Sequence, residues 1–100
     1  ELIEVFYFEA RKDLAEAEQA VVKEDFGRFK QAVHRLHGAG QLLEIKELKD
    51  ILSPIEMMDK TELTTQFCLT VLTKISRILH KVSEEIAIIC PAEPATLPDR

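Results

Sequence analysis

The segment DFGRFKQAVHRLHGAGQLL, residues 25–43, decides the fold expected for this chain. At about 100° per residue, its core-type residues gather on one side of a helix instead of alternating as in a strand. These residues are Phe29, Ala32, Leu36, Gly40 and Leu43. Asp25 is placed to accept hydrogen bonds from the free amides of a first turn, so the helix is expected to begin there. The segment is therefore predicted to be an amphipathic helix with one buried stripe.

Three other segments, residues 1–23, 45–58 and 59–90, show the same helical spacing of apolar residues, and none alternates like a strand. Four amphipathic helices with short joins predict an all-α protein, an antiparallel up-down four-helix bundle over residues 1–90. Residues 91–100 hold three of the four prolines and are predicted to be a disordered tail.

Local signals refine these helices. Pro54 interrupts the spacing of the third helix, which predicts a kink or an early stop near Leu52. Asp59 and Glu62 have the spacing of a capping box that opens the fourth helix. The buried stripe expected on that helix is Phe67, Val71, Ile75, Ile78, Val82, Ile86 and Ile89. Outside these stripes, Met57 and Met58 are expected to fill the core or a loop, and Phe6, Tyr7 and Phe8 to cap the bundle.

Composition excludes several functions. The 100 residues, with 46% hydrophobic and 31% charged side chains, are typical of one soluble domain. A net charge of −5 argues against general binding of nucleic acid, which needs a basic face. No apolar run approaches the roughly 20 residues that span a bilayer, so no membrane contact is expected. The chain has no initiator Met and starts within an amphipathic segment, so we expect a piece of a longer protein.

The two cysteines indicate the compartment. Cys68 and Cys90 fall on one predicted helix, roughly 33 Å apart at 1.5 Å per residue, which is too far for a disulfide. A reducing, cytoplasmic setting is therefore expected, with Cys68 as a small core residue.

His34 is the candidate functional residue. It points about 150° away from the centre of the buried stripe, into water. The residues around it on that face are small or polar, and they are Gly27, Lys30, Gln31, Gly38 and Gln41. Gly38 costs a helix about 0.5–1 kcal/mol relative to alanine, and its missing side chain would clear the approach to the imidazole. An exposed, uncrowded histidine suits a group that another macromolecule must reach.

The charges near His34 support a partner site. No acidic residue occurs between Phe26 and Leu43, whereas Arg28, Lys30 and Arg35 are positive. This basic window is expected to attract an acidic partner pocket or a phosphoryl group.

The stretch AVHRLHGAG, residues 32–40, resembles the signature of histidine-containing phosphotransfer (HPt) domains, whose pattern is His-x-x-Lys-Gly. The match covers most of residues 1–60. Outside the signature, the residues that resemble the family are Phe6, Asp13, Leu14, Asp25, Leu48, Leu52 and Glu56. The resemblance implies a phosphorelay intermediate. His34 would accept a phosphoryl group from a receiver-domain aspartate and pass it to a response-regulator aspartate, with Mg²⁺ supplied by the receiver and no cofactor or metal of its own.

Two positions depart from the family pattern. His37 stands where the family has lysine, and Glu44 stands where it tends to have glycine, which questions the turn after the second helix. With Lys30, Arg35, Gly38 and Gln41, His37 is expected to support the phosphoryl group or the partner, when protonated or as a neutral N–H donor. A permanent charge in His37→Lys is therefore expected to preserve or speed transfer.

The resemblance also implies a parent protein: the domain would be monomeric and would form the C-terminal part of a bacterial hybrid sensor histidine kinase. No glycine-rich phosphate loop for ATP is visible, so any enzymatic activity would belong to that parent phosphotransferase. The alternative is a non-phosphorylated helical adaptor that docks a receiver or kinase domain.

Further readings of the histidines stay open. His34 could be a plain surface residue, and His37 could be the acceptor instead. The two could share a metal, but no acidic residue or cysteine on their face completes a ligand set. His80 is expected on the surface.

Overall fold

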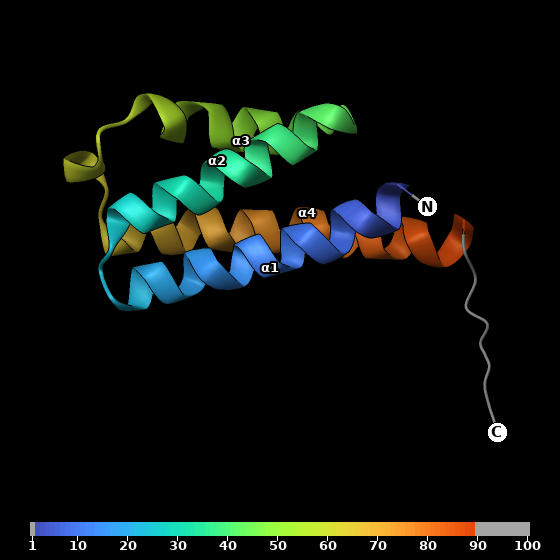
Figure 1. The fold of residues 1–100 in the computed structure, drawn as a ribbon, viewed down its shortest axis with the longest axis horizontal. Helices are drawn as coiled ribbons and strands as arrows, with labels where there is room; N and C mark the ends of the chain where they lie inside the picture. Colours follow the sequence, from blue (N-terminus) through green and yellow to red (C-terminus); the bar gives the residue numbers. More distant parts are fainter. Residues whose placement is uncertain (1, 90–100) are drawn as a thin grey trace, which may run out of the picture.

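The computed structural model describes residues 2–89 and contains four α-helices: α1 (Leu2–Val22), α2 (Phe26–Leu42), α3 (Lys46–Met57) and α4 (Thr65–Ile89). A short 3₁₀ helix, η1 (Lys60–Glu62), precedes α4, and residues 2–89 include no strand. Each helix runs back along its predecessor, and α2 and α3 lie along the part of α1 and α4 that is away from the chain termini (Figure 1). The predicted all-α antiparallel four-helix bundle is confirmed. The predicted tail and Cys90 lie outside the described residues.

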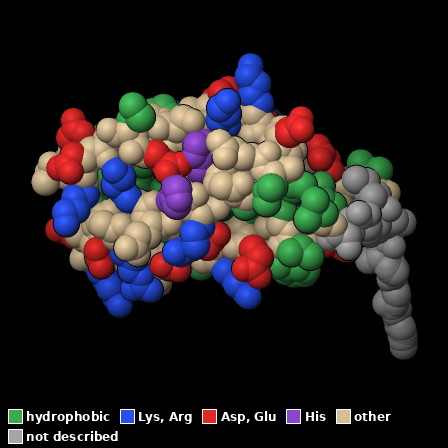
Figure 2. Space-filling view, turned by 45° about the horizontal axis from the view of Figure 1, so that its top comes forward, with side chains coloured by type: hydrophobic (Ala, Val, Ile, Leu, Met, Phe, Trp, Pro, Cys, Tyr) green, Lys and Arg blue, Asp and Glu red, His purple; other side chains and the backbone are tan. Residues whose placement is uncertain are grey.

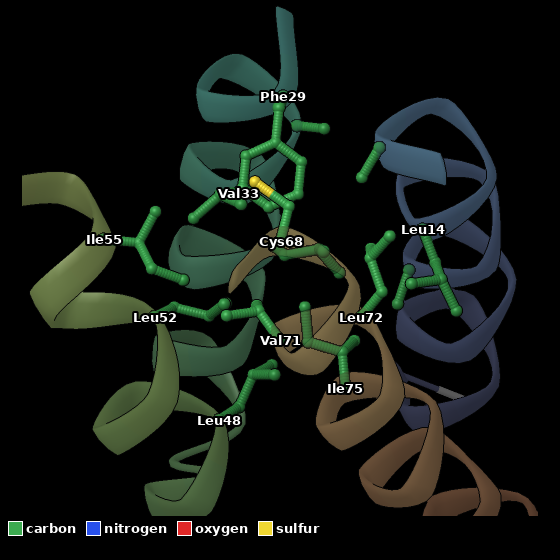
Figure 3. Close-up of a cluster of buried hydrophobic side chains, with 14 of the residues drawn as sticks. Leu14, Phe29, Val33, Leu48, Leu52, Ile55, Cys68, Val71, Leu72 and Ile75 are labelled. Atoms are coloured by element: carbon green, nitrogen blue, oxygen red, sulfur yellow. The ribbon is translucent and has the colours of Figure 1, made fainter. Parts of the chain in front are cut away.

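The core lies where the inner faces of the four helices meet. On α2 the predicted stripe is confirmed, because Phe29, Ala32, Leu36 and Gly40 are buried and Leu43 packs against them. Figure 3 shows side chains from α3 and α4 meeting those of α2.

Cys68 is confirmed as a core residue. It is fully buried and lies beside Phe29 and Val33 of α2 (Figure 3). Burial raises the pKa of the Cys68 thiol, so the side chain behaves as a small hydrophobic group.

The turn after α2 forms despite the missing glycine. The Ile45 N–H donates to the Gly40 carbonyl at 3.0 Å and the Glu44 N–H to the Gln41 carbonyl at 3.1 Å. These two bonds make a Schellman motif, in which the residue past the helix end takes the left-handed conformation. Glu44 has φ 55°, so it adopts the backbone that glycine would take without steric cost.

The sequence predicts a kink or an early stop near Leu52. The early stop is wrong, because α3 continues through Pro54 to Met57. Proline removes the single hydrogen bond that its N–H would have made, and only three residues of helix follow it. Leu52 and Ile55 on either side of Pro54 are fully buried, so their packing holds the last turn in place.

The prediction that the capping box opens α4 is also wrong. Asp59 and Glu62 form the box, but it caps η1. The chain then buries Leu63, and α4 begins at Thr65, where the Thr64 hydroxyl accepts from the Phe67 N–H at 3.1 Å. A capping box satisfies free amides at the start of either kind of helix, so the pattern alone does not separate them.

Some apolar residues fall outside the core. On α4, Phe67 is 37% exposed, because the buried stripe is centred on a line through Cys68, Leu72 and Leu79. Val71, Ile75, Ile78 and Val82 are buried as predicted and Ile86 packs against the core, whereas the side chain of Ile89 lies outside the described part. Met57 is 88% exposed, contrary to prediction, while Met58 packs against the core. Of the three aromatic residues, Phe6 is buried and Tyr7 half-buried, but Phe8 is exposed.

Candidate functional site

His34 projects from the outer face of α2, and its side chain is 78% exposed, as predicted. Figure 2 shows two histidine side chains in the middle of one face of the molecule, with acidic side chains close by. One turn beyond His34, a methyl group added to Gly38 would meet no atom within 4 Å. The surface next to the imidazole is therefore open, and Gly38 keeps it open.

Gly40, only two residues further along α2, has the opposite surroundings. It is buried, and a methyl group added there would lie 2.7 Å from Leu48 Cδ2 of α3. Gly40 thus lets α3 approach α2 closely. That close approach brings the end of α3 up to the histidines.

Glu56, near the end of α3, bridges the two histidines of α2. Its Oε1 lies 2.6 Å from His34 Nδ1, and its Oε2 contacts His37 Nδ1. His37 is only 16% exposed, and its Nε2 lies 3.3 Å from the Ser53 hydroxyl. An acidic residue therefore lies beside the histidine pair, although it completes no metal-ligand set within residues 2–89. Glu56 comes from the neighbouring helix α3, so the pattern of residues along α2 alone does not predict it.

The bridge fixes the protonation of the imidazole atoms that it touches. Burial alone would raise the pKa of Glu56, but the hydrogen bonds from His34 and His37 outweigh burial and lower it. An ionised carboxylate only accepts hydrogen bonds, so each Nδ1 carries the proton that faces Glu56. His34 Nε2, which has no partner among residues 2–89, then presents its lone pair to solvent.

The predicted basic window is largely neutralised in three dimensions. Arg35 pairs with two carboxylates of α1, at 2.6 Å from Glu16 and 3.1 Å from Asp13, and Arg28 lies 3.5 Å from Glu16. The hydrogen bond from Arg35 is the main cause of a lowered pKa of Glu16. Lys30 donates to the Met58 carbonyl. The expectation of an unbalanced positive window is therefore wrong, because packing brings acidic residues from α1 and α3 against it.

The remaining predicted site residues divide into two groups. Lys30, Gln31, His34, Arg35 and Glu56 line one open hollow on this face. Gln41 instead lines a separate hollow at the turn between α2 and α3, so the structure does not bring it to His34. Gly38 is beside His34 on the same helix, and His37 reaches it only through Glu56.

The third histidine lies on another part of the surface. His80 is exposed, as predicted, and lies 3.5 Å from Glu84 one turn along α4. Within residues 2–89, no group of three or more His, Cys, Asp or Glu side chains is arranged to hold a metal ion. Of the helices that the structure describes, none combines the length and the apolar character needed to cross a bilayer.

Comparison with known proteins gives the same family as the sequence pattern. The family model described as "Hpt domain" matches residues 1–85. Sensor protein EvgS of Escherichia coli K12 is 30% identical over 90 residues, and that of E. coli O157:H7 is 29% identical over 90 residues. The alignments cover 90% of this chain but 8% of each relative, so the chain spans a small part of these proteins. No solved structure gives a significant match.

Proposed function

This chain belongs to the Hpt domain family, and from that premise we propose that His34 is its phosphoryl acceptor. Hpt domains are histidine phosphotransfer modules that work with receiver domains in two-component phosphorelays. We propose that a receiver-domain phospho-aspartate donates to His34 and that the aspartate of a response regulator then takes the group.

The observation that carries this proposal is the opposite state of the two ring nitrogens of His34. Nδ1 is held 2.6 Å from Glu56, while the rest of the ring faces solvent beside the empty surface over Gly38. A nucleophilic imidazole needs one unprotonated nitrogen and a fixed orientation, and a carboxylate on the other nitrogen supplies both. His37 is not available for attack, because Ser53 occupies its Nε2 and its side chain is only 16% exposed.

The first transfer step needs no external base, because the attacking nitrogen carries no proton. The lone pair of His34 Nε2 attacks phosphorus, the N–P bond forms, and the P–O bond to the aspartate breaks to release its carboxylate. The ring keeps its Nδ1 proton and becomes cationic, and the Glu56 carboxylate beside it offsets that charge. In the second step the next receiver's carboxylate attacks phosphorus and the N–P bond breaks.

The partner supplies the rest of the chemistry. Receivers bring the carboxylates and the Mg²⁺ that stabilises the transferring group, and this domain brings the nucleophile. Lys30 and Arg35 line the hollow around His34, so they would contact the docked receiver, while their internal pairs limit the charge that they offer. We propose that this domain is monomeric and cytoplasmic and that it belongs to a hybrid sensor histidine kinase. The similarity to Sensor protein EvgS supports a parent protein that is a sensor.

A non-phosphorylated adaptor is the second candidate. The observation that favours it is His37, since the lysine of the family pattern is replaced by a side chain turned into the seam between α2 and α3. Such an adaptor would dock a receiver or kinase domain through the same face.

Labelling separates the two functions. The domain is incubated with a panel of receiver domains carrying ³²P on aspartate, and acid-labile, base-stable label on the domain is measured. We expect label on the wild type and on His80→Gln, a matched surface control, and none on His34→Gln. Label that persists in His34→Gln contradicts the acceptor assignment. A receiver that binds the domain but never labels it supports the adaptor.

A further inference from the structure

We propose that His37 is a positioning residue that acts on His34 through Glu56, and that Ser53 holds it in that role in both of its protonation states. The inference rests on the proposed function, because it concerns the nucleophile of that reaction. It also explains how the chain works without the lysine of the family pattern.

His37 is not placed to touch a phosphoryl group. Its ring lies in the seam between α2 and α3, and its two nitrogens contact Glu56 and Ser53, both on α3. A side chain whose only polar atoms are both occupied inside the fold has no donor left for a visiting group. Any effect of His37 on transfer must therefore pass through its partners.

Glu56 carries that effect. Each of its carboxylate oxygens serves one histidine, Oε1 for His34 and Oε2 for His37. Water competes freely at the exposed His34 end but much less at the His37 end. The bond to His37 therefore fixes the rotation of the carboxylate and keeps Oε1 against His34 Nδ1, which leaves the lone pair on Nε2.

Ser53 lets His37 hold Glu56 whether the His37 ring is neutral or protonated. A hydroxyl both donates and accepts. When His37 is neutral, the Ser53 O–H donates to Nε2; when His37 is protonated, Nε2–H donates to the Ser53 oxygen, 3.3 Å away. In both states the Nδ1–H still points at Glu56. The contact that holds Glu56 is thus kept in both states.

The other charged groups near His37 do not replace this contact. On α2, His34 points outward, and the Lys30 ammonium is engaged by the Met58 carbonyl. From η1, Lys60 lies near Gly27 at the far end of α2, and the α1 carboxylates pair with Arg28 and Arg35. Glu56 is therefore the charged group that contacts the His37 ring.

The test uses His37→Phe and Ser53→Ala, with His80→Phe and Ser76→Ala as matched surface controls. Two quantities are measured from about pH 6 to 8, the range in which histidine titrates. They are the single-turnover rate of transfer from a ³²P-labelled receiver, and the ¹⁵N shifts of the His34 ring, which report its tautomer. The controls lie on α4, where Ser76 is exposed and His80 pairs with Glu84.

We expect His37→Phe to slow transfer about two- to tenfold, the worth of one hydrogen bond, and to reduce the Nδ1–H form of His34. His37→Lys keeps a donor to Glu56 and should restore the rate. Ser53→Ala should transfer more slowly than Ser76→Ala, because neutral His37 then loses the partner that keeps its proton on Nδ1.

Unchanged rates and an unchanged His34 tautomer in both His37→Phe and Ser53→Ala would overturn the inference. If His37→Phe does not fold, the result for Ser53→Ala alone tests the inference. Absence of label on the wild type would contradict the proposed function instead, and the ¹⁵N shifts would still show whether His37 and Ser53 control the His34 ring.

Discussion

The outer and inner faces of α2 each carry a glycine that costs the helix stability, yet the cost is offset in different ways. On the inner face, Gly40 admits Leu48, so packing within the chain compensates for it. On the outer face, a methyl group added to Gly38 would meet no atom of the described residues within 4 Å. A destabilising residue with no internal compensation, one turn from an exposed histidine, agrees with the proposal that a partner docks on this surface.

Gly40→Ala should have the largest effect on stability. The added methyl would lie 2.7 Å from Leu48 Cδ2, and Leu48 is fully buried, so it has little room to move. We expect a loss of about 1–3 kcal/mol in the free energy of unfolding, even though alanine favours helix. Urea unfolding followed by circular dichroism measures it. An increase in stability would show that the two glycines do not differ in the way argued here.

Gly38→Ala should change stability in the opposite direction. It is expected to gain about 0.5–1 kcal/mol, because alanine forms helix better and the methyl meets no atom. A larger side chain, in Gly38→Gln, should slow transfer from a phosphorylated receiver while the domain remains folded. Transfer at the wild-type rate in Gly38→Gln would remove the functional reason for this glycine.

A third position tests the same reasoning where glycine is missing. Glu44→Gly at the end of α2 should raise the free energy of unfolding by about 0.5 kcal/mol, since relief of left-handed strain exceeds the added flexibility of the unfolded chain. Glu24→Gly is the matched variant, because Glu24 ends α1 with the same φ of 55° and the same pair of hydrogen bonds. Thermal unfolding of both variants checks the prediction, and a lower melting temperature in both contradicts it.

Acid should slightly reduce the stability that the bonds between Glu56 and the two histidines contribute to the fold. The pKa of Glu56 is lowered in the folded state, so its bonds to the histidines contribute stability above the unfolded pKa of about 4.5 and lose it as the pH falls through the folded value. We expect Glu56→Gln to lower the free energy of unfolding at pH 7 by less than about 1 kcal/mol. The variant should also lose less stability than the wild type as the pH falls. Melting temperatures between about pH 3 and 7 give the comparison. Equal acid loss in the variant and the wild type would assign that loss to other carboxylates.

The predictions from sequence succeeded where the cause is local and failed where it comes from another helix. The inner stripe of α2 and the Asp25 cap follow from spacing along one segment, and both are observed. The continuation of α3 past Pro54 depends on burial of Leu52 and Ile55, which one-dimensional patterns do not contain.

The site shows the same division. The exposure of His34 follows from its place on the helical wheel, but Glu56 lies 22 residues away and reaches it only because Gly40 lets α3 close on α2. The pairing of Arg35 with Asp13 also spans 22 residues and cancels a charge that appears free along α2. Knowing the register between neighbouring helices would have given both contacts.

The most direct test of the central claim is the identity of the phosphorylated atom. The domain, labelled with ¹⁵N in its histidines, is phosphorylated by a receiver, and ¹⁵N and ³¹P NMR spectra assign the N–P bond. The account predicts a single phosphohistidine at His34, bonded through Nε2, with Nδ1 still protonated beside Glu56. A phosphoryl group on His34 Nδ1, or on His37, would contradict it.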